Sequence, residues 1–224
     1  MDTTSAESWV TRWEAQQDRF MPDREERFAL MFELLRLLVG EGPMTVLDLG
    51  CGPGSLAIRL LDRFPQARVI GVDLDPVLLQ IGRQVHGDEP RLRFVTADLS
   101  QPGWERTLPL DEAPAAALST TALHWLELDD LTRLYADLAR LLRPGGAFLD
   151  GDHAHLPGQP RLVEAAAKLA ELLRDRRTRP LGEGETWEGW WEAVRDDPAL
   201  AGAIARRDRL GHGHHRGTPI DDAE

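Results

Sequence analysis

A glycine-rich segment that directly follows an apolar run constrains the fold of this 224-residue chain more than any other feature. Residues 44–49 read MTVLDL, and residues 50–54 read GCGPG. The glycines allow a sharp turn out of a strand and let a ligand lie against the backbone. The segment therefore predicts a ligand beyond the carboxyl end of this strand, next to the N-terminus of a helix. A purely structural turn is the alternative.

From this point to about residue 150, short apolar segments alternate with amphipathic ones. We predict five strands, over residues 44–49, 68–73, 91–96, 113–120 and 147–151. Helices are expected between them, over residues 55–64, 76–85 and 129–142. Such alternation is typical of βαβ units with right-handed crossovers, so the predicted fold class is α/β with a doubly wound, mostly parallel sheet.

Helical segments flank the predicted sheet on both sides. Asp23 is a candidate N-cap for a helix over residues 24–39, and Trp9 and Trp13 share one face of an earlier helix. Past residue 152 the strand signals disappear, and helices are predicted over residues 161–177, 186–195 and 198–207. We divide the chain into an N-terminal helical lid (1–43), a core (44–152), a helical cap (153–209) and a flexible tail (210–224).

Composition narrows the possible functions. The chain has 26 basic and 38 acidic residues and a net charge of −12, so electrostatic attraction does not steer it to nucleic acid. Its single cysteine, Cys51, excludes an internal disulfide framework and favours a reducing, cytoplasmic setting. No apolar stretch is long enough to cross a membrane, and a signal peptide is not expected. The single lysine, Lys168, argues against Schiff-base chemistry.

The spacing of the glycines discriminates between nucleotide ligands. A dinucleotide fingerprint reads GxGxxG, whereas here the third glycine comes one residue early and Ser55 takes its place. A Walker loop is excluded, because no Gly-Lys-Ser/Thr follows.

Two aspartates end the second and third predicted strands. Asp73 can accept hydrogen bonds from both hydroxyls of a ribose, although a plain turn role is the alternative, because Asp75 can cap the next helix by itself. Asp98 can accept a hydrogen bond from the exocyclic amine of adenine, again with a turn role as the alternative.

Five motifs occur in a characteristic order: VLDLGCGPG (46–54), VIGVDLD (69–75), TADL (96–99), STTALHWL (119–126) and LLRPGGAFL (141–149). Together they resemble the class I S-adenosylmethionine-dependent methyltransferases over residues 44–151. The resemblance implies a Rossmann-like sheet and S-adenosylmethionine (SAM) as the cofactor. The residues that it implies for cofactor binding are Asp48, Gly50, Cys51, Gly52 and Gly54 at the methionine part, Asp73 at the ribose, Leu74, Asp98 and Leu99 around the adenine, and Thr120 next to the methyl-transfer site.

The resemblance implies an enzyme that transfers a methyl group to an O, N or C nucleophile of a small molecule by in-line displacement. Because the sulfonium is already activated, the enzyme mainly supplies alignment and an apolar pocket. A non-catalytic or truncated SAM-binding protein is one alternative. A nicotinamide-dependent oxidoreductase is another, and the glycine spacing counts against it. Neither nucleic acid nor a membrane is expected as a partner.

His124 is a candidate catalytic residue outside the cofactor motifs. It follows the fourth predicted strand, and the ordinary pKa of histidine suits a general base near neutral pH. The alternative is a packing role before Trp125.

Other aromatic and histidine residues are assigned as follows. Trp187, Trp190 and Trp191 fall on one helix face and are expected to belong to the core rather than to roof a pocket. No metal site is expected, and the basic run 174–179 is interpreted as a solvated helix end. The possible lid residues are Trp13, Arg19 and Phe20, and the histidines considered and rejected as metal ligands are His153, His155, His212, His214 and His215.

The sequence departs from the family after the fifth strand. Family sheets usually close there with an antiparallel strand pair, and no residues past 152 carry a strand pattern. We therefore predict a five-stranded sheet without that pair, with the fifth strand as an exposed edge. The chain's own helices could cover this edge, a second copy could pair with it in a homodimer, or the chain is truncated.

Overall fold

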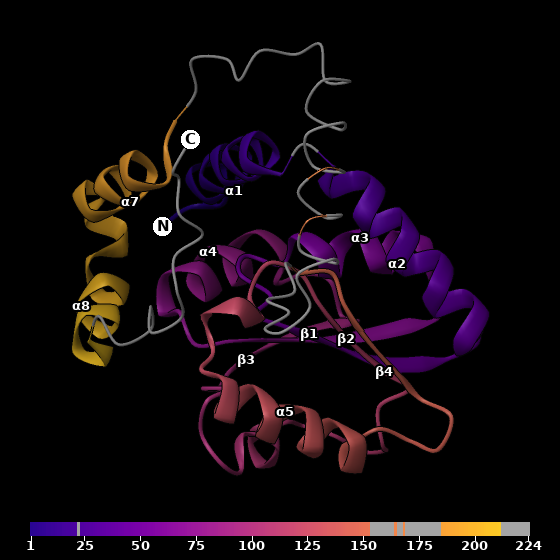
Figure 1. Cartoon of the computed structure of the whole chain (residues 1–224). Helices are drawn as coiled ribbons and strands as arrows, with labels where there is room; N and C mark the ends of the chain where they lie inside the picture. Colours follow the sequence, from indigo (N-terminus) through magenta and orange to yellow (C-terminus); the bar gives the residue numbers. More distant parts are fainter. Residues whose placement is uncertain (22, 153–163, 165–167, 169–184, 212–224) are drawn as a thin grey trace.

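The computed structural model describes residues 1–21, 23–152, 164, 168 and 185–211 (Figure 1). This described part contains one five-stranded sheet in the order β3-β2-β1-β4-β5, and every neighbouring pair is parallel. The strands are β1 (Met44–Leu49), β2 (Ala67–Asp73), β3 (Leu92–Thr96), β4 (Ala116–Ser119) and β5 (Ala147–Asp150). Within the described residues, the predicted α/β class, the five predicted strands and their parallel arrangement are confirmed, although β4 is shorter than the predicted 113–120.

The strand order places a topological switch point at the centre of the sheet. β1 pairs with β2 on one side and with β4 on the other, so Asp48 has Gly71 and Leu118 as its register partners. Connections leave the sheet in opposite directions on the two sides of β1, which opens a crevice beyond the carboxyl ends of these strands. Ligands of open α/β sheets bind in this crevice.

Helices cover both faces of the sheet, as its nearly continuous apolar strands require. The long helices are α1 (Thr3–Phe20), α2 (Arg24–Leu38), α3 (Ser55–Arg63), α4 (Pro76–His86), α5 (Leu128–Leu141), α7 (Trp187–Asp196) and α8 (Ala201–Leu210). Figure 1 shows α5 on one side of the sheet and α2 and α3 on the other. Phe28, Leu60 and Val46 belong to one buried apolar cluster, on the α2–α3 side, whereas Leu134 and Leu47 belong to another, on the α5 side.

A tryptophan cluster joins the N-terminal helix to the C-terminal helices. Trp190 is fully buried and meets the rings of Trp9 and Trp13 edge-on, with centroid distances of 5.7 and 5.1 Å. Trp191 is also buried, and Trp187 packs against the cluster while partly exposed. The predicted core role of these tryptophans is therefore confirmed.

The helix predicted over residues 198–207 is wrong in its first turn. Pro198–Leu200 form a 3₁₀ turn, and the α-helix begins only at Ala201. The Asp197 carboxylate accepts the Ala199 N–H at 2.8 Å and the Trp9 indole N–H at 2.8 Å. Asp197 therefore caps this turn, because its carboxylate accepts a backbone N–H that has no partner within the turn.

The two predicted helix caps have different outcomes. Asp75 caps α4, because its carboxylate accepts the N–H groups of Val77 at 2.8 Å and Leu78 at 3.3 Å. Asp23 stands at the N-cap position of α2 but makes no capping hydrogen bond, so that prediction is wrong. Its carboxylate instead pairs with Arg27 at 3.3 Å, four residues along the helix.

Strand β5 ends the described sheet, with β4 as its partner. α7 and α8 pack against α1 and α4, at a distance from β5, so the described part of the predicted cap does not cover this edge. Of the predicted helix 161–177, only residues 164 and 168 are described, and both are helical. The basic run 174–179, the tail beyond 211 and the five histidines rejected as metal ligands lie outside the described residues. Across the described ranges, no helix is long and apolar enough to cross a membrane.

Candidate active site

The glycine turn leaves β1 at the carboxyl edge of the sheet and leads directly into α3. Gly50, Gly52 and Gly54 have φ values of 71°, 53° and 100°, in the left-handed region that favours glycine. The N–H groups of Gly50 and Cys51 donate to the Val72 carbonyl of β2 at 2.8 and 3.1 Å. The turn is thus fastened to the neighbouring strand.

The segment after β4 crosses directly over this turn. A Cβ atom on Gly50 would lie 2.2 Å from the Cβ of Ala122, so only glycine fits there. Thr121 has a φ of 52°, an uncommon backbone conformation for a non-glycine residue. The buried Ser119 hydroxyl donates to the Leu49 carbonyl at 2.7 Å and ties the ends of β4 and β1 together. The chain from Thr120 to His124 therefore lies at the same edge of the sheet as the glycine turn.

Asp73 closes the glycine turn from the end of β2. Its Oδ2 accepts the Gly52 N–H at 2.7 Å, and its Oδ1 accepts the Asp75 N–H at 2.8 Å. Loss of water around the carboxylate raises its pKa to about 6, although both hydrogen bonds favour the charged form. The predicted ribose residue and the predicted glycine turn are therefore in direct contact.

Asp48 lies beneath the turn and is only 2% exposed. Burial, followed by the nearby charge of Asp73, raises its pKa to about 7. One of its carboxylate oxygens is buried without a hydrogen-bond partner in the described part of the chain. Burial also raises the pKa of the Cys51 thiol, so this cysteine is not a reactive thiolate. A buried carboxylate oxygen without a partner suits a cationic ligand group, such as the amino group of SAM.

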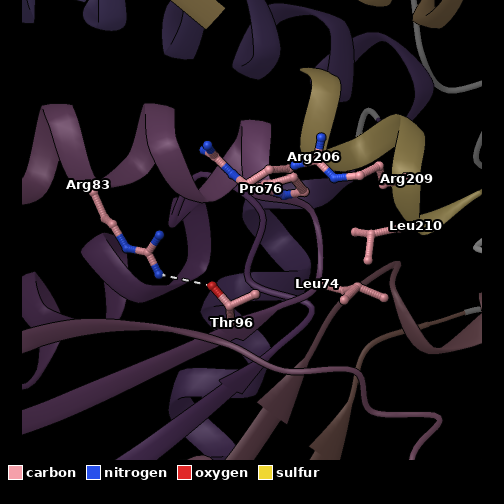
Figure 2. A pocket seen from close by; sticks show the side chains of 7 residues that line it. All are labelled: Leu74, Pro76, Arg83, Thr96, Arg206, Arg209 and Leu210. Carbon is pink, nitrogen blue, oxygen red and sulfur yellow. Dashed lines mark hydrogen bonds between the residues drawn. The ribbon is translucent and has the colours of Figure 1, made fainter. Parts of the chain in front are cut away.

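A pocket of about 330 Å³ opens beside the ends of β2 and β3 (Figure 2). Leu74, which follows β2, and Thr96, the last residue of β3, line it, and the Thr96 hydroxyl accepts a hydrogen bond from Arg83 of α4 at 3.3 Å. The complete lining is Leu74, Pro76, Arg83, Thr96, Arg206, Arg209 and Leu210. Leu74, which the resemblance places beside the adenine, therefore borders this pocket.

Asp98 and Leu99 follow β3, as predicted. The Asp98 carboxylate accepts both the Ser100 N–H at 2.9 Å and the Ser100 hydroxyl at 2.6 Å. These bonds make Asp98 a turn residue in the described structure, which was the alternative interpretation, and they leave its adenine role as a prediction. Leu99 is buried among apolar side chains on the α5 side of the sheet.

Helix α1 lies over the glycine turn. A Cβ atom on Gly52 would be 3.6 Å from the Trp13 ring. The next residue of α1, Glu14, accepts hydrogen bonds from the Ser55 hydroxyl at the start of α3 and from Arg24 and Arg59. Of the possible lid residues, Trp13 is therefore placed against the turn, whereas Phe20 is 48% exposed.

His124 is bound by a carboxylate that the sequence analysis missed. Its Nδ1 lies 2.9 and 2.8 Å from the two carboxylate oxygens of Asp152, and its backbone N–H donates to the same side chain at 3.1 Å. The rule that carboxyl ends of parallel strands meet at one edge could have pointed to Asp152, because it follows the fifth predicted strand. Among the described residues, no group of three or more His, Cys, Asp or Glu side chains is arranged to hold a metal ion.

A family model described as a methyltransferase domain matches residues 46–146. A trans-aconitate 2-methyltransferase from Azoarcus sp. (strain BH72) is 37% identical over 209 residues, which cover 86% of this chain and 76% of the relative. The chain belongs to the class I SAM-dependent methyltransferases. This membership decides against the nicotinamide-dependent alternative.

Other comparisons agree with this family. A trans-aconitate 2-methyltransferase from Methylobacterium radiotolerans is 33% identical over 182 residues, 81% of this chain and 59% of that relative. The chain spans 53% of a further such relative, from Acidovorax ebreus. SAM-bound CalS10, an amino pentose methyltransferase from Micromonospora echinaspora, superposes with a TM-score of 0.50 at 22% identity over 61% of this chain and 54% of that one, which shows the fold.

Proposed function

We propose that this chain transfers a methyl group from SAM to a nucleophilic O, N or C atom of a small molecule. The observation that carries the proposal is the 2.7 Å hydrogen bond between the Gly52 N–H and Asp73. This bond joins the glycine turn of β1 to the acid of β2 at the switch point of the sheet, where a nucleoside is expected to bind.

Each part of the site has a proposed role toward the cofactor, which supplies the activated methyl group when bound. Asp73 holds the ribose hydroxyls, and the orphaned oxygen of Asp48 faces the cationic amino group. Trp13 and the rest of α1 exclude water from the turn. The remaining proposed contacts are Gly50, Cys51, Gly52 and Gly54 at the methionine part, Leu74, Asp98 and Leu99 at the adenine, and Thr120 beside the methyl group.

The acceptor is proposed to be a small molecule. The names of the relatives supply the first compounds to test, namely trans-aconitate and an amino pentose. A net charge of −12 supports a small molecule over nucleic acid. The buried single cysteine supports a reducing, cytoplasmic setting, and pairing of two β5 edges is a proposed route to a homodimer.

The cofactor role of Asp73 is tested by calorimetric titration with SAM. Asp73→Ala should weaken SAM binding by about 1–3 kcal/mol, because the variant removes a charged hydrogen-bond acceptor for the ribose. Asp88→Ala is the matched control, since it removes an exposed carboxylate that is not among the proposed cofactor contacts. Unchanged SAM affinity in Asp73→Ala would refute the ribose role.

Turnover is tested separately from binding. The unaltered chain is incubated with methyl-labelled SAM and a panel of carboxylate, hydroxyl and amine acceptors that includes the two named compounds. Labelled product supports the enzyme, whereas saturable SAM binding without product across the panel favours the non-catalytic alternative.

A further inference from the structure

A buried carboxylate holds the histidine that follows β4. The Asp152 side chain is only 5% exposed, and the His124 side chain is 15% exposed. Both carboxylate oxygens lie within 2.9 Å of the His124 Nδ1. None of the proposed cofactor contacts uses either side chain, so the pair needs an explanation of its own.

The backbone next to Asp152 is fixed from two sides. The Gly151 N–H donates to the Ser119 carbonyl at 2.8 Å, which extends the β4–β5 ladder by one residue. The Gly151 carbonyl accepts a hydrogen bond from Arg27 of α2 at 2.6 Å. Because β4 also carries the segment that crosses Gly50, the same strand fixes both Asp152 and His124 relative to the glycine turn.

This geometry selects one form of the histidine ring. An ionised carboxylate can only accept hydrogen bonds, so the proton of the neutral ring is on Nδ1 and the lone pair is on Nε2. The same carboxylate stabilises the ring when Nε2 gains a proton. A histidine held in this way is prepared to take a proton from a neighbouring molecule.

We propose that Asp152 is the positioning residue of His124, which acts as general base toward an acceptor whose reacting atom carries a proton, a hydroxyl or an amine. The proposal rests on the proposed methyl transfer and adds an acceptor class to it. A carboxylate acceptor has no proton to lose near neutral pH and does not need this pair.

The step balances without a further reactant. The acceptor atom forms a bond to the methyl carbon while the carbon–sulfur bond breaks, and the electron pair of that bond goes to sulfur. The proton of the acceptor goes to the His124 Nε2 and later to solvent. The Nδ1 proton stays on the His124 ring throughout, in its hydrogen bond to Asp152.

A purely structural role for Asp152 is the competing explanation, because its carboxylate also accepts the backbone N–H of the short turn Leu123–Trp125. Asp152→Asn separates the two. The amide oxygen can still accept the backbone N–H, which turns the amide NH₂ toward Nδ1 and favours a ring proton on Nε2. We expect the fold to be kept and the tautomer to be reversed.

The tautomer is read by ¹⁵N NMR on histidine-labelled protein, with the His124 signals assigned by their loss in His124→Gln. We expect a protonated Nδ1 in the unaltered chain and a protonated Nε2 in Asp152→Asn. Asp150→Asn is the matched control. It removes a nearby carboxylate that is exposed and bonded to Tyr135 at 3.3 Å, and it should leave the tautomer unchanged.

The kinetic arm uses the best hydroxyl or amine acceptor found in the panel. Asp152→Asn and His124→Gln should each lower kcat by about 10²-fold, with no further loss in the double variant and no change in SAM affinity. If Asp152→Asn does not fold, Asp152→Ala replaces it, with recovery of kcat by added formate as the expected result.

Three results would overturn the proposal: an unchanged tautomer in Asp152→Asn, an unchanged kcat, or an equal loss of kcat on a carboxylate acceptor. Failure of the proposed function looks different, since the unaltered chain would then either not bind SAM in the calorimeter or give no labelled product from any acceptor. The NMR measurement needs no acceptor and decides the positioning role in either case.

Discussion

Replacement of Asp48 by asparagine should change how the stability of the chain depends on pH. Asp48 is 2% exposed, and burial raises its pKa from 3.8 to about 7. The folded chain therefore holds a proton on this side chain over a pH range in which the unfolded chain has released it. Across that range, the free energy of unfolding falls as pH rises.

The size of the effect follows from the difference between the two pKa values. Each pKa unit corresponds to about 1.4 kcal/mol, so the full difference between 3.8 and about 7 amounts to about 4 kcal/mol. Of this amount, ionisation of Asp48 removes about 2 kcal/mol from the free energy of unfolding between about pH 5.5 and pH 8.5. Asp48→Asn cannot ionise, so it should lose about 2 kcal/mol less than the unaltered chain over this interval.

Urea unfolding at these two pH values measures the effect. Comparison of the variant with the unaltered chain cancels the contributions of other groups that titrate in the interval, Asp73 and Asp150 among them. Asp88→Asn, which removes an exposed carboxylate, should keep the full pH dependence. If Asp48→Asn and the unaltered chain lose the same free energy, the argument from burial is wrong.

Two further changes probe packing around the site and are measured by urea unfolding. Gly50→Ala should destabilise the chain by about 2–5 kcal/mol, because its φ of 71° is unfavourable and its Cβ would meet the Cβ of Ala122 at 2.2 Å. Gly40→Ala has a similar φ penalty, at 101°, but open space around the new Cβ, so it should cost only about 1–2 kcal/mol; equal costs would contradict the close approach. Trp190→Ala should cost about 3–5 kcal/mol, because the ring is fully buried. Trp187→Ala should lower the free energy of unfolding clearly less than Trp190→Ala, because Trp187 is partly exposed. The reverse order would refute the core assignment of Trp190.

Local patterns predicted most of the sheet. β1 has the predicted bounds, and β2 begins one residue earlier than expected, because both strands are apolar runs with β-branched residues. β4 was predicted too long, since its alanine-rich sequence has a weak strand preference and its ends depend on pairing with β1 and β5.

Other details depended on partners that are distant in the sequence. Asp197 starts a 3₁₀ turn while it accepts the indole N–H of Trp9, 188 residues away. Asp152 was missed because its partner, His124, is 28 residues earlier in the chain, and neither residue alone has a spacing that reveals the pair.

The sequence by itself determined the glycine turn and the order of strands and helices, which follow from periodicity and turn chemistry, properties of neighbouring residues. The methyltransferase family was indicated separately, by the resemblance that the five ordered motifs carry. Only the tertiary structure decided that Ala122 lies on Gly50, that Asp152 holds His124, and that α7 and α8 pack on α1 and α4 at a distance from β5. The reason is physical: such contacts gain their free energy from burial and hydrogen bonding between segments that only the folded sheet brings together.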